Sequence, residues 1–197
     1  SYLDSYFRRE NSDLSFYKEL NDNLSLLQDI TNELGDSAIG SYLTEFYNAA
    51  QQLSLNPSDL VARQNFIQKA SDLCSRFNQT AEQLTNLRTN LVGNPEVPGS
   101  IGESKIKLTC DELNTKLEEL AKLNETISAS CSFGAVPNNL LDERDLLLDQ
   151  ISEYLPITVT SGANNVINVS SNNVELVRGS RKLGTFEVTQ GDNINPA

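Results

Sequence analysis

Apolar residues recur at steps of three and four over the first three quarters of the chain, which is the period of an amphipathic helix. This pattern predicts five helices, at 1–35, 40–53, 56–91, 103–130 and 138–154. Gly, Pro, Ser and Asn gather in the breaks between them, near 35–40, 54–56, 93–102 and 132–137. We therefore expect an elongated antiparallel bundle of long helices over residues 1–155.

Each expected helix has an apolar stripe that we predict to face the core. In chain order the stripes are Leu3, Phe7, Leu14, Tyr17, Leu20, Leu24, Leu27, Ile30 and Leu34; Tyr42, Phe46, Ala49 and Leu53; Leu60, Ile67, Ala70, Cys74, Phe77, Ala81, Leu84 and Leu91; Ile106, Cys110, Leu113, Leu117, Leu120, Leu123 and Ile127; and Leu140, Leu141, Leu147, Leu148 and Ile151. Their near-heptad spacing predicts long partner helices.

Helix boundaries are indicated by capping residues. Gly35 is a plausible C-terminal stop for the first helix. Asn56 can cap the third helix, with Pro57 at its first position and Asp59 near its positive end. Asn138 or Asn139 is the expected cap of the last helix.

After Pro156 the period changes from that of a helix to that of a strand. The runs ITVT, VINVS, VELVR and GTFEVT alternate apolar and polar residues, and SGANN, SNN and GSRKLG separate them. Residues 156–197 are therefore expected to form a small β meander or a pair of hairpins. So small a sheet must pack on the bundle or continue in sequence beyond this chain. The expected class is mainly α, with a small C-terminal β segment.

Composition narrows the classes of function. The net charge of −12 and pI of about 4.4 argue against a nucleic-acid-binding surface. No apolar run is long enough to span a bilayer. The chain opens without Met on SYLDSYF, which reads as helix interior, so we expect a fragment of a longer protein. Cys74 and Cys110 are interpreted as small buried hydrophobes, and Cys131, near a helix end, as a free thiol.

Enzymatic patterns are missing from the sequence. It contains no histidine, and its Gly-rich stretches match neither a P-loop nor a dinucleotide-binding loop. Asp142, Asp145 and Asp149 are one turn apart and are interpreted as the solvated flank of an amphipathic helix. We expect no catalytic, cofactor-binding or metal-binding residue, and no cofactor.

Three arginines on or beside apolar stripes have two interpretations. Arg144, between two pairs of leucines, either covers the core with its stem while its head meets a carboxylate, or bridges two helices or two subunits through an acid pair. Arg63 and Arg76 have the same two interpretations. We expect Arg144 to tether its helix within the chain.

Several segments resemble one family. Residues 60–78 have the pattern LxxRQxxIxxAxxLxxRFN, residues 138–145 read NNLLDERD, and residues 123–127, 174–179 and 46–59 read LNETI, VELVRG and FYNAAQQLSLNPSD. In this order they resemble the family of flagellar hook-associated protein 1. The loop at 93–102 and the three cysteines depart from the family's pattern.

This resemblance implies a non-enzymatic subunit of the secreted, extracellular bacterial flagellum that joins hook to filament, here without the terminal segments used for polymerisation. It implies as partners copies of the same protein in a ring, the hook protein, the adjacent hook-associated protein and an export chaperone that binds segments outside this chain. The acidic charge and the lack of a long apolar run predict no nucleic-acid partner and no membrane partner. We expect the isolated chain to be mainly monomeric at micromolar concentration.

Two alternatives stay open. A coiled-coil adhesin stalk or a secretion-system tip protein would also have long acidic amphipathic helices. Neither of these proteins would require the segment 137–148 followed directly by paired short strands. An enzyme is the weaker alternative.

Overall fold

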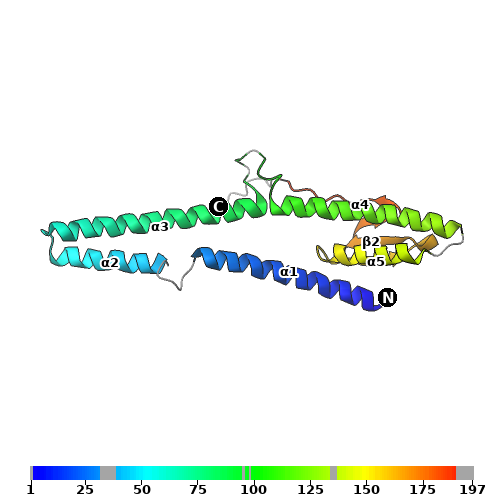
Figure 1. The fold of residues 1–197 in the computed structure, drawn as a ribbon, viewed down its shortest axis with the longest axis horizontal. Helices are drawn as coiled ribbons and strands as arrows, with labels where there is room; N and C mark the ends of the chain where they lie inside the picture. The colour runs from blue at the N-terminus through cyan, green and yellow to red at the C-terminus, as the bar shows by residue number, and fades with distance from the viewer. Residues whose placement is uncertain (1, 32–38, 95, 98, 134–136, 190–197) are drawn as a thin grey trace. The chain divides into compact units, whose positions relative to one another are not determined.

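The computed structural model describes residues 2–31, 39–94, 96–97, 99–133 and 137–189. Within these ranges five helices come first along the chain: α1 (Tyr2–Thr31), α2 (Ile39–Leu55), α3 (Leu60–Val92), α4 (Lys105–Ser132) and α5 (Asn138–Ser152) (Figure 1). Four strands follow: β1 (Thr158–Ser161), β2 (Ile167–Ser171), β3 (Val174–Arg178) and β4 (Arg181–Lys182), with a 3-10 turn η1 (Ala163–Asn165) after β1. The mainly α class with a small C-terminal sheet is confirmed.

The chain divides into two compact units. One comprises residues 1–20 and 91–197, and the other residues 21–90. The predicted division into a helical domain through residue 155 and a separate β segment stays a prediction. Leu34, the helix stop at Gly35 and the tail from residue 190 lie outside the described residues.

Helix α3 begins at Leu60, four residues after the predicted start at Asn56, because of local hydrogen bonds. The Asp59 carboxylate accepts the backbone amide of Val61 at 2.8 Å and so caps the helix. Asn56 instead forms a preceding turn, in which its carbonyl accepts the amide of Asp59 at 3.1 Å. The cap is therefore Asp59 rather than Asn56.

The next boundaries also depend on single residues. Gly93 follows the end of α3 with a φ of +80°, and a Cβ at this position would lie 2.6 Å from the Cα of Ile101. Ser104 caps α4 by accepting the amide of Lys107 at 3.4 Å. Helix α5 begins after Pro137 without a side-chain capping bond, so the expected asparagine cap is wrong.

The strands form an antiparallel meander in the order β1-β2-β3-β4. Ser171 pairs with Val174, which leaves Asn172 and Asn173 as a two-residue turn with φ values of 47° and 67°. Positive φ at both positions suits a tight hairpin, because its twist matches that of the strands, and Asn tolerates this conformation.

The fourth predicted strand is wrong. Residues 184–189 (GTFEVT) form no strand, and β4 lies earlier, in a segment that was expected to be a turn. After β4 the amides of Leu183 and Gly184 both donate to the carbonyl of Leu176, at 2.8 and 3.3 Å, which ends the ladder. The chain then follows α4 instead of β3.

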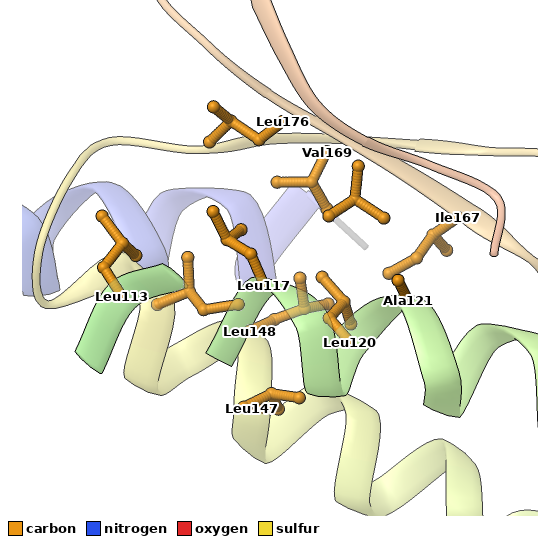
Figure 2. Close-up of a cluster of buried hydrophobic side chains, with 11 residues drawn as sticks. Leu113, Leu117, Leu120, Ala121, Leu147, Leu148, Ile167, Val169 and Leu176 are labelled. Carbon is orange, nitrogen blue, oxygen red and sulfur yellow. The ribbon is translucent and has the colours of Figure 1, made fainter. Parts of the chain in front are cut away.

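The core lies where α4, α5 and the sheet meet. Its buried side chains come from four elements (Figure 2): Leu113, Leu117, Leu120, Ala121, Leu147, Leu148, Ile151, Ile167, Val169, Leu176 and Val177. Each fully buried leucine, isoleucine or valine contributes about 1.5–3 kcal/mol relative to exposure. The small sheet is thus stabilised by the two helices that it covers.

Two asparagines of α4 bind backbone groups of the β segment. Asn124, fully buried, donates to the carbonyls of Ile167 and Gly179 at 3.0 and 2.8 Å and accepts the Ile167 amide at 3.4 Å. Asn114 donates to the carbonyl of Phe186 at 2.7 Å and accepts its amide at 2.9 Å. These side chains supply the hydrogen bonds that a neighbouring strand would otherwise make. The backbone amide and carbonyl of Phe186 are therefore paired although the residue lies outside the sheet.

The unit of residues 21–90 is built differently. Helices α2 and α3 run antiparallel, with the rings of Phe46 and Phe66 5.2 Å apart and Lys69 Nζ 2.7 Å from the carboxylate of Glu45. Among the described residues of this unit, only Ala49 and Thr80 are buried. This unit therefore lacks a core comparable to that of the other.

Candidate functional site

Helix α1 docks through its polar side. Arg8 and Ser12 are its buried residues, and Asn11 beside them is half-buried. Spacings of three and four place these residues on one face of the helix. A surface helix normally packs its apolar face on the core and leaves its polar face in solvent. Helix α1 does the opposite, and it is therefore a candidate for a functional role.

The partner of this polar face is α5. Arg8 Nε donates to Asp149 Oδ1 at 2.8 Å, and Arg8 Nη2 to Asp145 Oδ1 at 3.4 Å. Asn11 Nδ2 donates to the carbonyl of Asp149 at 3.1 Å and to the hydroxyl of Ser152 at 3.0 Å. We call these five residues the polar clamp. Its charge-assisted bonds fix both the register and the face with which α1 meets α5.

The opposite face of α1 is apolar and exposed. Seven residues of the first predicted stripe are exposed: Leu3, Phe7, Leu14, Tyr17, Leu20, Leu24 and Leu27. Leu3 and Leu14, for example, keep 73% and 67% of their surface in solvent. The expectation that this stripe faces the core is therefore wrong. Exposed apolar residues that follow one helix face mark a surface for association.

Helix α3 likewise exposes much of its predicted stripe. Leu60, Ile67 and Phe77 are 71%, 66% and 49% exposed, and Cys74 is exposed as well. The face turned toward α2 instead includes Phe66, which meets Phe46. The apolar surface of α3 is wider than one packed face, so one stripe stays uncovered.

Arg144 joins α5 to η1 rather than to another helix. Its Nη1 donates to the backbone carbonyl of Asn165, and its buried Nε has no hydrogen-bond partner among the described residues. Burial lowers the pKa of Arg144 from its ordinary value; the nearby Arg8 acts in the same direction and the Asp145 carboxylate opposes it. A tether within the chain is present, but the expected carboxylate partner is wrong.

Arg63 and Arg76 make local contacts. Arg63 Nε donates to the carbonyl of Pro57 at 2.8 Å, just before α3 begins. Arg76 Nη1 donates to Gln79 at 3.4 Å, one turn along the same helix, and its buried Nε has no partner among the described residues. Neither of these bonds joins two helices.

The cysteines occupy three different environments. Cys74 is exposed, so its interpretation as a buried hydrophobe is wrong, because it lies on the uncovered stripe of α3. Cys110 is half-buried on α4. Cys131, near the end of α4, is a free thiol whose sulfur accepts a hydrogen bond from Asn165 Nδ2 at 3.4 Å.

An open groove of about 620 Å³ lies between α4 and α5. Its apolar lining is formed by Leu123, Leu140, Leu146 and Leu147. Its polar lining is formed by Glu119, Lys122, Thr126, Glu143 and Gln150. A leucine floor between charged rims suits the apolar side of a helix better than a small polar ligand.

The described part of the chain has neither a candidate metal site nor a helix that could cross a membrane. In the ranges that the structure describes, no three His, Cys, Asp or Glu side chains lie close enough together to hold a metal ion. No described helix has both the length and the apolar character that crossing a bilayer requires.

Sequence reasoning missed the polar clamp. Asp145 and Asp149 were interpreted as a solvated flank, whereas both bind Arg8. A signal existed, because Arg8, Asn11 and Ser12 repeat at helical spacing on the side away from the leucines. It was overlooked because the apolar side was assumed to be the docked one.

Comparison with known families gives one match that covers most of the chain. Residues 24–197 match the family described as "Flagellar hook-associated protein FlgK helical domain". Flagellar hook-associated protein 1 of Bacillus subtilis is 30% identical over 197 residues, which cover 98% of this chain and 36% of that protein. The protein of the same name from Escherichia coli is 30% identical over 147 residues, or 73% of this chain and 25% of that protein.

A solved structure agrees with the fold. The flagellar hook junction protein FlgK from Burkholderia pseudomallei superposes with a TM-score of 0.72 at 24% identity, over 90% of this chain and 29% of that one. At this identity the likeness concerns the fold. The chain spans about a third or less of the length of these relatives.

Proposed function

Because this chain belongs to the family of the helical domain of flagellar hook-associated protein FlgK, we propose that it is a structural part of a bacterial flagellum, within a longer protein that joins the hook to the filament. The observation that carries the proposal is the family match over residues 24–197. It includes all of α2 to α5 and the whole sheet.

The site is consistent with a structural role. The polar clamp orders α1 through side chains that are costly to bury unless paired, so it fixes orientation as well as docking. The apolar faces of α1 and α3 supply surface for packing against other helices. Long helices with such faces are suited to building an axial structure.

The proposed partners follow from the family. They are other copies of the longer protein in a ring, the hook protein and the adjacent hook-associated protein. An export chaperone would bind segments beyond this chain. The proposed location is the extracellular flagellum, reached through the flagellar secretion channel, and the proposed role is non-enzymatic. The relatives' names support this role over an adhesin stalk or a secretion-system tip protein.

Gene deletion and antibody labelling test whether the longer protein is located at the junction of hook and filament. In the organism of origin, the gene that encodes it is deleted, and cells are scored for motility and for filaments on their hooks. Gold-labelled antibodies raised against this chain are then applied to intact flagella of the parent strain.

We expect bare hooks and no swimming in the deletion strain, restoration by the intact gene, and gold only at the boundary between hook and filament. Normal filaments after deletion, or gold distributed along the whole filament, would contradict the proposal. The deletion strain serves as the labelling control.

A further inference from the structure

The first part of α1 adds nothing to the apolar core of its unit. Residues 2–20 belong to the same compact unit as α4, α5 and the sheet. Every leucine, phenylalanine and tyrosine of this stretch is at least 42% exposed, and none of them packs on the core. Apolar burial normally supplies most of the energy that docks a helix. The docking of residues 2–20 therefore depends on polar contacts.

These polar contacts are partly exposed to solvent. In the polar clamp, the side chains of Asp145 and Asp149 are 61% and 37% exposed. One further ion pair joins Glu19 of α1 to Lys105 of α4, and these side chains are 48% and 54% exposed. The backbones of α1 and α5 come close at hardly any position, so the contact depends on side chains. Exposed ion pairs contribute little and are screened by salt, so the docked state of α1 is only weakly favoured.

The side of α5 that faces α1 keeps its own hydrogen bonds when α1 leaves. Ser152 Oγ donates to the carbonyl of Asp149 at 2.6 Å, within the same helix. Water already reaches the carboxylates of Asp145 and Asp149. Two penalties usually hold a helix in place, namely the exposure of apolar surface and the loss of partners by buried polar groups. Both penalties are small for the release of α1.

A second arginine opposes the clamp. Arg144, next to Asp145 on α5, donates to the carbonyl of Asn165 in η1. Burial lowers the pKa of Arg144, the Asp145 carboxylate raises it, and the charge of Arg8 lowers it. Arg8 and Arg144 thus lie close enough to repel each other, while both are attracted to Asp145. Because like charges at short range destabilise each other, Arg144 weakens the docking of Arg8.

We propose that residues 2–20 of α1 form a strap that undocks from α5 and docks again while α4, α5 and the sheet stay folded. The polar clamp holds this strap, and the charge of Arg144 limits how tightly it is held. An isolated helix of this length is marginal in water, so the released strap also loses helical structure. Helix α1 can therefore change its contacts without unfolding of the core.

Hydrogen exchange on the 197-residue chain, resolved by peptide, measures the release, because exchange follows the population of the open form when closing is fast. Amides of the strap should exchange faster than those of α4 by about tenfold or more. Raising NaCl from about 0.05 M to about 0.5 M should speed exchange in the strap by about twofold or more, because salt screens the clamp. Exchange in α4 should stay constant or slow down, because salt also screens the repulsion within a chain of net charge −12.

Substitutions on the two sides of Asp145 should act in opposite directions. Arg8→Ala removes both carboxylate contacts and should speed exchange in the strap by about fivefold or more, whereas Arg9→Ala, at an exposed neighbour, should leave it unchanged. Arg144→Met removes the repulsion and should slow exchange in the strap by about twofold or more. Arg144→Lys keeps the positive charge and is the matched control. Exchange in α4 shows whether the core of each variant is folded.

Equal exchange rates in the strap and in α4 would overturn the proposal, because the strap would then open only when the whole unit unfolds. A strap whose exchange responds neither to salt nor to Arg8→Ala would show that the clamp does not hold it, which also overturns the proposal. Faster exchange in the strap of Arg144→Met would overturn the opposing role of Arg144. Slower exchange in Arg144→Met, together with the parent rate in Arg144→Lys, would confirm that role.

Discussion

Arg8 is the residue on which the docking of α1 depends most. Arg8→Ala removes both carboxylate contacts, and we expect it to lower the free energy of unfolding by about 1–2 kcal/mol. The value is below that of a fully buried pair, because the Asp149 and Asp145 side chains are 37% and 61% exposed. Urea unfolding measures it, with Arg9→Ala, an exposed neighbour, as the control. Equal effects of the two substitutions would contradict the clamp.

Arg144 is expected to stabilise the fold through both its guanidinium group and its aliphatic stem. Arg144→Ala should cost about 1–2 kcal/mol, because the carbonyl of Asn165 loses its charged donor. Arg144→Met keeps most of the aliphatic stem and should recover the part that comes from packing. Thermal melts of the two variants separate the contributions. If Arg144→Met were as stable as the parent chain, the bond to Asn165 would add nothing.

Asn124 is expected to be the most sensitive polar residue of the larger unit. Asn124→Ala leaves the carbonyls of Ile167 and Gly179 without their donor in a fully buried position, at a cost of about 2–4 kcal/mol. Asn114→Ala is the matched control, since Asn114 makes the same kind of bond from a half-buried position, and about 1–2 kcal/mol is expected there. Similar losses in denaturant unfolding would show that burial is not the deciding factor.

At the scale of elements, α5 is the helix on which the others converge. One face packs on the core through Leu148, another binds α1 through Asp145 and Asp149, and a third lines the groove with Leu146. A helix with three occupied or available faces cannot be described by a single apolar stripe. This explains why Leu147, Leu148 and Ile151 were predicted correctly as buried, whereas Leu140 and Leu141 are only half-buried and the acids beside them were misread.

Two leucines two residues apart on α5 test this division. Leu148 is 1% exposed and Leu146 is 60% exposed. Leu148→Ala should lower the free energy of unfolding by about 2–5 kcal/mol, as is usual for a fully buried leucine, whereas Leu146→Ala should change it by less than about 0.5 kcal/mol. Chemical denaturation of both variants at low protein concentration gives the comparison. A large effect at Leu146 would mean that the groove is closed in solution.

At the scale of the whole molecule, the two units differ in how much they bury. The unit that contains α4, α5 and the sheet has the main apolar core. The unit of residues 21–90 buries only Ala49 and Thr80 among its described residues. Local stability follows buried contacts, so the second unit should open more readily.

Hydrogen exchange followed by mass spectrometry checks this difference. Amides of α4, α5, β2 and β3 should be protected longest, and those of α2 should exchange at least tenfold faster. Leu117→Ala, at the centre of the core, should speed exchange in the protected group and leave α2 unchanged. Equal protection of α2 and α4 would show that the two units unfold together.

The sequence by itself determined the class and the order of elements. The change from a period of three and four to a period of two at Pro156 separated helices from strands, because the geometry of each element dictates which residues share a face. For α4 the middle of the predicted stripe is buried, at Leu113, Leu117, Leu120 and Ile127, whereas Ile106 at its start is 44% exposed. There one apolar face meets one core, so periodicity was sufficient.

Only the tertiary structure decided which face of a helix is covered. In α1 the polar face is docked because Arg8 finds two carboxylates on α5, residues more than a hundred positions away in the chain. In the β segment, Asn114 satisfies the backbone of Phe186 and removes the need for a fourth long strand. Periodicity shows that a helix has two different faces, but partners distant in sequence determine which one is buried.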